Sequence, residues 1–286
     1  MLNFMIGVLI IVILFFIGVM VYDGNRFHKV EYTVSSPKIH GNEKIIVLSD
    51  LHNQSYGKEN EKLLQAIYAE DPDAIYVAGD MITSEVSASM ENAISLMEKL
   101  AEKYPIYYGM GNHEYKLSMF PEKFGNMYQI YEDKMQKAGV RILRNEHIYL
   151  PESNIDVCGL EIERTYFAKM QKKKMPEAYV EKLAGHPRRD AFQILIAHNP
   201  DYFPQYAAWG ADLVLSGHIH GGIMRLPLLG GVISPTLQLF PHYDGGRFEE
   251  GTSTMILSRG LGMHTLHIRI FNPGELVVIH LTEGKK

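Results

Sequence analysis

Apolar residues follow two patterns along this chain. Short runs that are apolar at nearly every position, such as 44–49 and 192–197, predict strands that are buried on both faces. Apolar residues spaced three and four apart, as in 59–69, predict amphipathic helices. From residue 44 to residue 109 the two patterns alternate at intervals of roughly 30 residues, as in βαβ units. This half of the chain is therefore predicted to form a parallel sheet covered by helices.

The second half of the chain is predicted to add more strands than helices. One helix ends near Ala138, and residues 163–176 are irregular and basic. Short apolar runs predict the strands, at 141–150, 155–160, 213–216, 254–258 and 276–281. Together with the parallel first half, these runs indicate an α/β protein with two β-rich regions.

The longest apolar run lies at the N-terminus, where the 19 residues from Phe4 to Tyr22 carry no charge. As a helix this run would extend ~28 Å, close to the ~30 Å hydrocarbon thickness of a bilayer. A secretory signal would place Lys or Arg before the run and a small-x-small cleavage site after it. Residues 1–3 carry no basic side chain, and residues 18–22 make a poor cleavage site. We therefore favour an uncleaved membrane anchor over a cleaved signal or a buried core helix.

These features predict a single-pass protein of the cell membrane. We expect a membrane anchor over 1–25, a linker and lead-in over 26–43, and a globular domain over 44–286. Basic residues near the anchor, such as Arg26 and Lys29, follow it and weakly favour a cytoplasmic domain. Because this bias is small, the sequence leaves open on which side of the membrane the domain lies. The sequence also leaves the oligomeric state open.

Composition narrows the chemistry. The 286 residues are 46% apolar and 21% charged, as in ordinary globular proteins, and the net charge of −5 gives no reason to expect a nucleic-acid partner. The single cysteine, Cys158, excludes an internal disulfide and a zinc site built from several cysteines. Any metal would therefore be held by His, Asp, Glu and Asn side chains.

Polar side chains follow five of the predicted strands, at the point where each strand ends. These residues are Asp50, His52, Asp80, Asn112, His113, His198, His218 and His220. In α/β sheets, ligands bind beyond the carboxyl ends of the strands. Each residue alone is more often a helix cap or a structural side chain, but this does not explain why all five strand ends carry one. The last two histidines lie in a glycine-framed turn, 216–222, and we expect the glycines to let both rings converge.

This set of side chains fits two metal ions. Carboxylate, imidazole and amide-oxygen ligands suit Mn²⁺, Fe²⁺, Zn²⁺ or Ni²⁺. Paired ions ~3.5–4 Å apart stabilise the attacking and leaving oxygens of a phosphoryl transfer and lower the pKa of a bound water. Such a pair of ions is one arrangement that this set of ligands would allow.

The motifs resemble those of the calcineurin-like metallophosphoesterases. The five blocks are Asp50-x-His52, Gly79-Asp80, Gly111-Asn112-His113-Glu114, His198 and Gly217-His218-x-His220. Three later segments, 239–241, 258–262 and 269–273, are similar to the YkuE/YaeI-type bacterial subgroup. The resemblance implies a four-layer α/β/β/α sandwich, which agrees with the two predicted β-rich regions.

The resemblance also implies a role for each residue. The ligands of one ion would be Asp50, His52, Asp80 and His220. Those of the other would be Asp80, Asn112, His198 and His218, with Asp80 as the bridge. His113 would be the general acid for the leaving group, oriented by a carboxylate. The expected reaction is attack of metal-bound hydroxide on a phosphodiester or pyrophosphate bond. The chain departs from the family pattern at Ile219 and Ile223, which are not ligand positions, and lacks the twin-arginine export signal of many relatives.

The substrate is less closely defined than the reaction. The resemblance implies a phosphorylated small molecule or lipid, including nucleotide-linked lipid precursors. Residues 164–175 mix basic and aromatic side chains, and residues 226–241 are largely apolar, which fits a membrane surface and equally fits a solvated loop and core packing. The alternatives are a phosphomonoesterase or nuclease of the same fold, or a non-catalytic scaffold. The scaffold is disfavoured because no ligand is missing.

Overall fold

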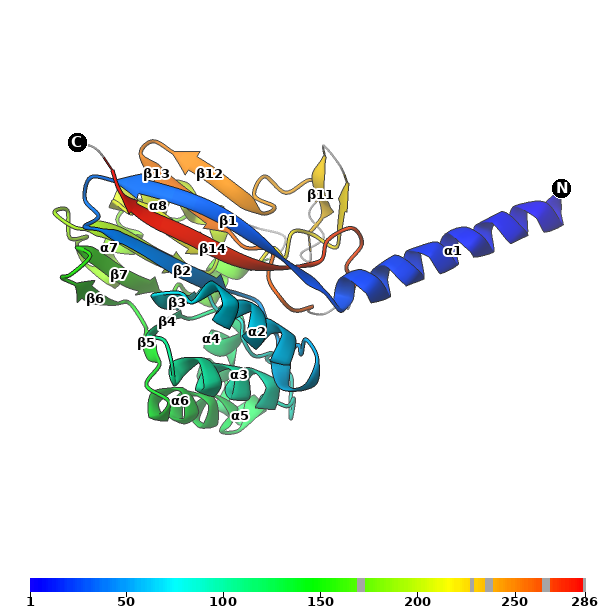
Figure 1. Ribbon diagram of the computed structural model, residues 1–286, viewed down its shortest axis with the longest axis horizontal. Helices are drawn as coiled ribbons and strands as arrows, with labels where there is room; N and C mark the ends of the chain where they lie inside the picture. Colours follow the sequence, from blue (N-terminus) through cyan, green and yellow to red (C-terminus); the bar gives the residue numbers. More distant parts are fainter. Residues whose placement is uncertain (169–172, 227–228, 235–238, 264–267, 285–286) are drawn as a thin grey trace.

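Two six-stranded sheets form the centre of the computed structural model, which describes residues 1–168, 173–226, 229–234, 239–263 and 268–284 (Figure 1). In spatial order, the first sheet contains β1 (Phe27–Ser36), β14 (Gly274–Glu283), β2 (Asn42–Leu48), β3 (Ala74–Val77), β4 (Ile106–Gly109) and β5 (Arg141–Leu143). The second contains β12 (Gly246–Glu250), β13 (Ser253–Leu257), β9 (Leu213–Ser216), β8 (Phe192–Ala197), β7 (Ile155–Leu160) and β6 (Glu146–Leu150). A separate hairpin pairs β10 (Met224–Leu226) with β11 (Gly230–Ile233).

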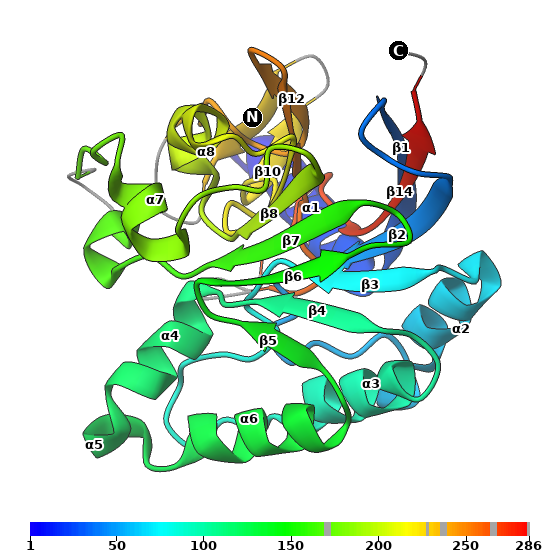
Figure 2. The ribbon, with the colours of Figure 1, turned by 90° about the vertical axis from the view of Figure 1, so that its left-hand side faces the viewer.

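Helices lie on the outer face of each sheet (Figure 2). The first sheet is covered by α2 (Glu61–Glu70), α3 (Glu91–Ala101), α4 (Asn112–Met119), α5 (Pro121–Phe124) and α6 (Met127–Lys137). The second is covered by α7 (Tyr179–Ala184) and α8 (Phe203–Trp209). Three short 3₁₀ helices, η1 (Lys58–Asn60), η2 (Arg164–Phe167) and η3 (Pro200–Tyr202), lie in the connections. The expected four-layer α/β/β/α sandwich is therefore confirmed.

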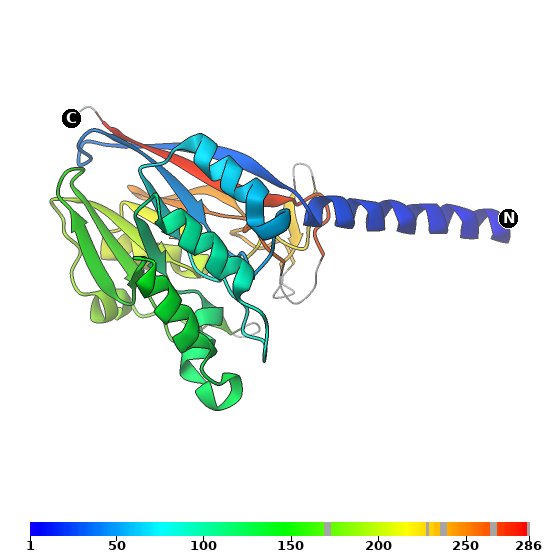
Figure 3. The same ribbon diagram turned by 60° about the horizontal axis from the view of Figure 1, so that its bottom comes forward.

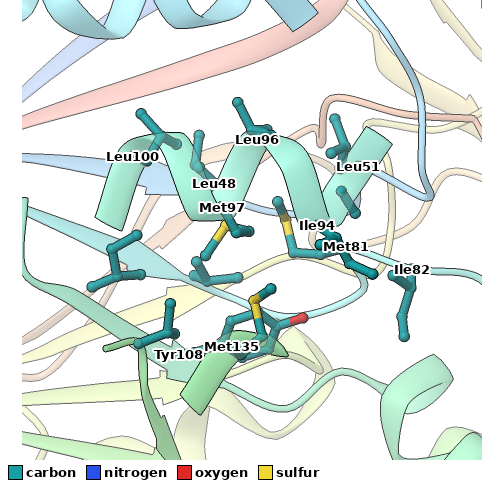
Figure 4. Close-up of a cluster of buried hydrophobic side chains, with 14 of the residues drawn as sticks. Leu48, Leu51, Met81, Ile82, Ile94, Leu96, Met97, Leu100, Tyr108 and Met135 are labelled. Carbon is teal, nitrogen blue, oxygen red and sulfur yellow. The ribbon is translucent and has the colours of Figure 1, made fainter. Parts of the chain in front are cut away.

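The layers follow from the alternation of side chains along each strand. In β2, Ile46 and Leu48 point toward the helices, whereas Ile45 and Val47 point toward the second sheet. Figure 4 shows the helix-facing cluster, in which Met97 of α3 and Met135 of α6 are buried together with Leu48. Because both faces of the strand are covered, nearly every position is apolar, which is why the sequence pattern identified these strands.

Residues 26–43, expected to be a linker and lead-in, contain the ten-residue strand β1. It pairs in parallel with β14 from Phe27 and Gly274 to Ser36 and Glu283. Most of its side chains stay partly exposed, so its sequence lacks the continuous apolar run of a buried strand. The sandwich therefore begins at Phe27, soon after the N-terminal helix ends at Gly24.

The N-terminal helix α1 (Leu2–Gly24) projects away from the sandwich (Figures 1 and 3). Among the described residues it is the helix long and apolar enough to cross a membrane, and none of its apolar window is buried against the rest of the protein. A signal sequence has the same properties. The structure thus provides a candidate membrane anchor of the predicted length.

The basic and aromatic stretch 164–175 divides between core and surface. Tyr166 and Met175 are buried in the core beneath α7. The amino group of Lys173 lies 3.4 Å from the carboxylate of Glu163. Lys169, Met170 and Lys172 lie outside the described residues. The two buried side chains favour core packing over contact with a membrane at this stretch.

Candidate metal centre

The carboxyl ends of strands from both sheets meet at one place. Strands β2, β3 and β4 are parallel neighbours, and so are β8 and β9 in the other sheet. Three groups of potential ligands lie there, and in each group one ligand atom from every residue is within 4.8 Å of the others: Asp50, His52 and His220; His52, Asp80 and His113; Asp80, His198 and His218. Asn112 begins α4 directly before His113. The eight strand-end residues that the sequence singled out therefore come together.

Asp80 lies at the centre of this arrangement. Its Oδ2 is 3.0 Å from Nε2 of His198 and 4.0 Å from Nε2 of both His52 and His113. The second carboxylate, Asp50, has its Oδ1 3.2 Å from Nε2 of His220 and 3.9 Å from Nε2 of His198. Nε2 of His52, from the first sheet, is also 3.9 Å from Oδ1 of Asp50. Each carboxylate thus faces histidines from both sheets, and Asp80 belongs to two of the three groups.

An unusual backbone conformation orients several of these side chains. Positive φ angles occur at Asp50 (52°), His52 (47°), Asp80 (56°), His218 (75°) and His220 (54°). Residues other than glycine rarely adopt this left-handed conformation, and such strain clusters at functional sites. Gly221 and Gly222 also have positive φ angles (70° and 88°), as expected for the turn at 216–222, and the two histidines share this conformation. Gly217 allows close approach, because a Cβ atom there would collide with the side chains of Ser49 and Asp50.

The side chain of Glu114 connects the ends of β3 and β4 through hydrogen bonds. Its fully buried carboxylate accepts hydrogen bonds from the backbone N–H of Asp80 (2.9 Å), Met81 (2.8 Å) and Gly111 (3.1 Å), and from the hydroxyl of Tyr108 (2.8 Å). Burial and the charge of Asp80 raise the pKa of this carboxyl to about 7. The sequence analysis gave this residue no role. A usable signal was its position three residues after Gly111, where a glutamate often caps a helix.

His113 is held by Ser84 at the side of its ring that faces away from Asp80. The backbone N–H of Ser84 donates to Nδ1 (2.8 Å), and the Ser84 hydroxyl is 3.0 Å from the same atom. We expected a carboxylate in this orienting position. Because a backbone N–H only donates, Nδ1 is an acceptor, and in the neutral ring the proton is on Nε2. Burial lowers the pKa of His113 and favours this neutral form.

Burial and neighbouring charges shift the pKa values of several residues in the site. Burial alone would raise the pKa of Asp50, but His220 and His198 outweigh it and hold the pKa well below its usual range. Burial lowers the pKa of His52, and burial together with His198 lowers that of His218 to about 3. His198 differs, because Asp80 and Asp50 outweigh its burial and raise its pKa to about 10, so a cation bound there would replace a proton. Ionised carboxylates beside the neutral imidazoles of His52 and His218 suit divalent cations.

The unpaired amide oxygen of Asn112 supports the same conclusion. Its Oδ1 is buried and has no hydrogen-bond partner, although such atoms are paired in the great majority of cases. A cation bound beside Asn112 would satisfy this oxygen. The mixture of carboxylate, imidazole and amide-oxygen donors suits Mn²⁺, Fe²⁺, Zn²⁺ or Ni²⁺, so the residues present fit a metal site.

Comparisons with known proteins agree with this geometry. The family model described as calcineurin-like phosphoesterase matches residues 43–222. The chain is 28% identical over 257 residues to the metallophosphoesterase YkuE of Bacillus subtilis, and the match covers 88% of this chain and 84% of YkuE. It is 27% identical over 222 residues to the phosphodiesterase YaeI of Escherichia coli, covering 77% of this chain and 75% of YaeI. The resemblance to the YkuE/YaeI subgroup is thereby confirmed.

A third relative is longer than this chain. It is an uncharacterized metallophosphoesterase of Campylobacter jejuni, 27% identical over 260 residues. The match covers 88% of this chain but only 62% of the relative's length. The similarity thus extends over most of this chain without covering all of that relative.

Proposed function

Because the chain belongs to the calcineurin-like phosphoesterases, which are hydrolases of phosphoester bonds, we propose that it cleaves a phosphodiester or pyrophosphate bond at a centre of two divalent metal ions. The position of Asp80 between two ligand groups is the observation that carries this proposal. One ion would be held by Asp50, His52, Asp80 and His220. The other would be held by Asp80, Asn112, His198 and His218. Asp80 would bridge them.

The bound ions would polarise the phosphoryl oxygens and lower the pKa of a water molecule. The protein's own part is to place two carboxylates and several imidazoles at one point. The fully buried carboxylate of Asp50 and the nearly buried one of Asp80 supply that charge, and Glu114 holds the backbone that carries Asp80. Fixed ligands of this kind need little reorganisation when the substrate binds.

His113 would supply a proton to the leaving group. During hydrolysis the oxygen of water bonds to phosphorus, the bond from phosphorus to the leaving oxygen breaks, and that oxygen takes up a proton. Nε2 of His113 lies 4.0 Å from Asp80, on the side of the site, while Ser84 occupies Nδ1. The proton that His113 carries is therefore directed toward the place where the leaving oxygen would lie.

We also propose that α1 anchors the protein in the cell membrane and that the substrate is a lipid-linked or nucleotide-linked phosphate. The support is the length of α1 and the exposure of its apolar residues. A phosphomonoesterase of the same fold is the main alternative. A nuclease is disfavoured because the net charge of −5 would repel a nucleic-acid backbone.

A substrate panel tests the reaction class. The full-length protein, supplied with Mn²⁺, would be assayed on aryl phosphomonoesters, aryl phosphodiesters and sugar-nucleotide lipids. We expect turnover of the diesters or of the lipid-linked pyrophosphates to exceed that of the monoesters. Turnover of monoesters alone would contradict the proposed bond preference. Failure on every substrate with the metal centre filled would favour the scaffold.

A further inference from the structure

Exposed apolar side chains gather beside the end of α1. Beyond Met1 and α1, the described residues include seven large hydrophobic side chains that are clearly exposed, and four of them lie on two neighbouring segments. These four are Leu229 (62% exposed), Leu239 (64%), Phe240 (57%) and Phe271 (43%), called the apolar rim below. Scattered exposed hydrophobic residues need no explanation, but a group of them does.

Hydrogen bonds tie the two segments of the rim to each other. The N–H of Arg225 in β10 donates to the carbonyl of Ile270 (3.0 Å), and the N–H of Ile270 donates to the carbonyl of Ile223 (3.1 Å). The N–H of Phe240 donates to the carbonyl of Val232 in β11 (2.9 Å). The hairpin and the segment around Phe271 are therefore one structural unit.

This unit is continuous with α1. The ring of Phe271 lies with its centroid 6.5 Å from that of Phe15 and 6.4 Å from that of Phe16, both on the helix. Figures 1 and 3 show the β10–β11 hairpin beside the end of α1 that joins the domain. The apolar surface of the helix thus continues onto the domain without a polar break at Phe271.

We propose that the apolar rim enters the interfacial region of the bilayer into which α1 is inserted, so that the domain rests on the membrane surface. This inference depends on the proposed role of α1 as a membrane anchor. The ring of Phe271 lies beside that of Phe16, which is eight residues before the last residue of α1. The Phe271 ring is therefore at the depth of the apolar part of the helix. Aromatic and leucine side chains on an interfacial surface are typically buried about 5–10 Å into the boundary between headgroups and acyl chains.

This position would bring the metal centre next to the lipid headgroups. Asn272, which follows Phe271, donates from its side-chain amide to the carbonyls of His220 and Gly222, both at 2.7 Å. The candidate ligand His220 is thus one hydrogen bond away from the residue after the rim. The substrate class that fits is an amphiphile whose phosphoester lies at headgroup level while its acyl chains stay in the bilayer.

Site-specific fluorescence on the full-length protein in phosphatidylcholine vesicles tests the proposal. The one native cysteine, Cys158, is buried, so introduced cysteines can be labelled selectively with an environment-sensitive dye. Phe240→Cys and Leu239→Cys report on the rim. Ile130→Cys on α6 is the control, because Ile130 is also an exposed apolar side chain (43%) but lies away from α1. Ile10→Cys reports on α1 itself.

We expect dyes at positions 239 and 240 to show blue-shifted emission, to be quenched by doxyl-labelled lipid and to be protected from aqueous iodide. The dye at position 130 should remain quenched by iodide. If the label at 10 is quenched by lipid but the rim labels respond to iodide like 130, the anchor stands and the rim proposal is overturned. If the label at 10 is not quenched by lipid, the anchor fails, and the rim proposal fails with it. Shielding of the rim from both quenchers would indicate a covering protein surface and would also overturn the proposal.

Discussion

The carboxylate of Asp23, at the end of α1, accepts a hydrogen bond from the backbone N–H of Asn272 (3.1 Å). Both residues are buried, and Arg26 neutralises Asp23 at 2.8 Å. Since the side chain of Asn272 in turn holds the carbonyls of His220 and Gly222, a short chain of contacts connects the helix to the candidate metal centre. The junction between helix and domain is therefore built into the fold.

We predict that Asp23→Ala destabilises the protein. The variant leaves the buried N–H of Asn272 without an acceptor, which costs about 1–3 kcal/mol. Asp23→Asn retains an acceptor and should cost less. Chemical denaturation of the full-length protein in detergent measures both. Equal stability of Asp23→Ala and the wild type would show that the contact contributes nothing to the junction.

His113→Ala should lower turnover by about 10²–10⁴-fold on esters with poor leaving groups, because general acid catalysis contributes on that scale. The loss should shrink with a very acidic phenol, which leaves without a proton. Ser84→Ala is the control, since it keeps the backbone N–H that bonds to Nδ1 and should change turnover little. An equal loss for good and poor leaving groups in His113→Ala would rule out proton donation.

Glu114→Gln should weaken the fold around Asp80 although it only replaces one oxygen of the carboxylate by an NH₂ group. The amide NH₂ of glutamine would face backbone N–H groups that now donate to an oxygen, at a cost of about 1–3 kcal/mol for a buried donor left unpaired. Urea denaturation compared with Glu122→Gln, an exposed position, measures the difference. The two variants should differ clearly, and identical midpoints would refute a structural role for Glu114.

His147 should make stability depend on pH in the alkaline range. Its Nδ1 is 2.6 Å from the carboxylate of Asp156, and the hydrogen bond with Asp156, followed by contact with Cys158, raises the pKa of His147 to about 10. Because the folded-state pKa of His147 lies above the ordinary value of 6.5, the stabilisation is complete below pH 6.5 and is lost as pH rises through 10. The stability difference between the wild type and His147→Gln should follow that course. A stability difference between the two proteins that does not change with pH would contradict this role of His147.

The buried strands and the candidate ligands could be predicted because their signals are local. Apolar runs covered on both faces end directly in Asp50, Asp80 and His198, so the pattern of the strand and the chemistry after it lie within a few residues of each other. β1 was missed because only one part of its surface is buried.

The residues that support the site could not be predicted in the same way. Asn272 bonds to a carbonyl 52 positions earlier in the chain, and Ser84 acts through its backbone N–H, which every residue except proline has. The identity of such residues says nothing about their partners. Only the packing of the two sheets brings these groups together.

Metal content per chain tests the central claim most directly. The full-length protein, saturated with Mn²⁺ and freed of excess, should contain two ions by elemental analysis, while His220→Ala and His198→Ala should each retain one and Asp80→Asn should retain fewer than either. These losses follow if the two ions have separate histidines and share Asp80. A single ion per chain in the active wild type, or full occupancy in Asp80→Asn, would contradict the two-ion centre.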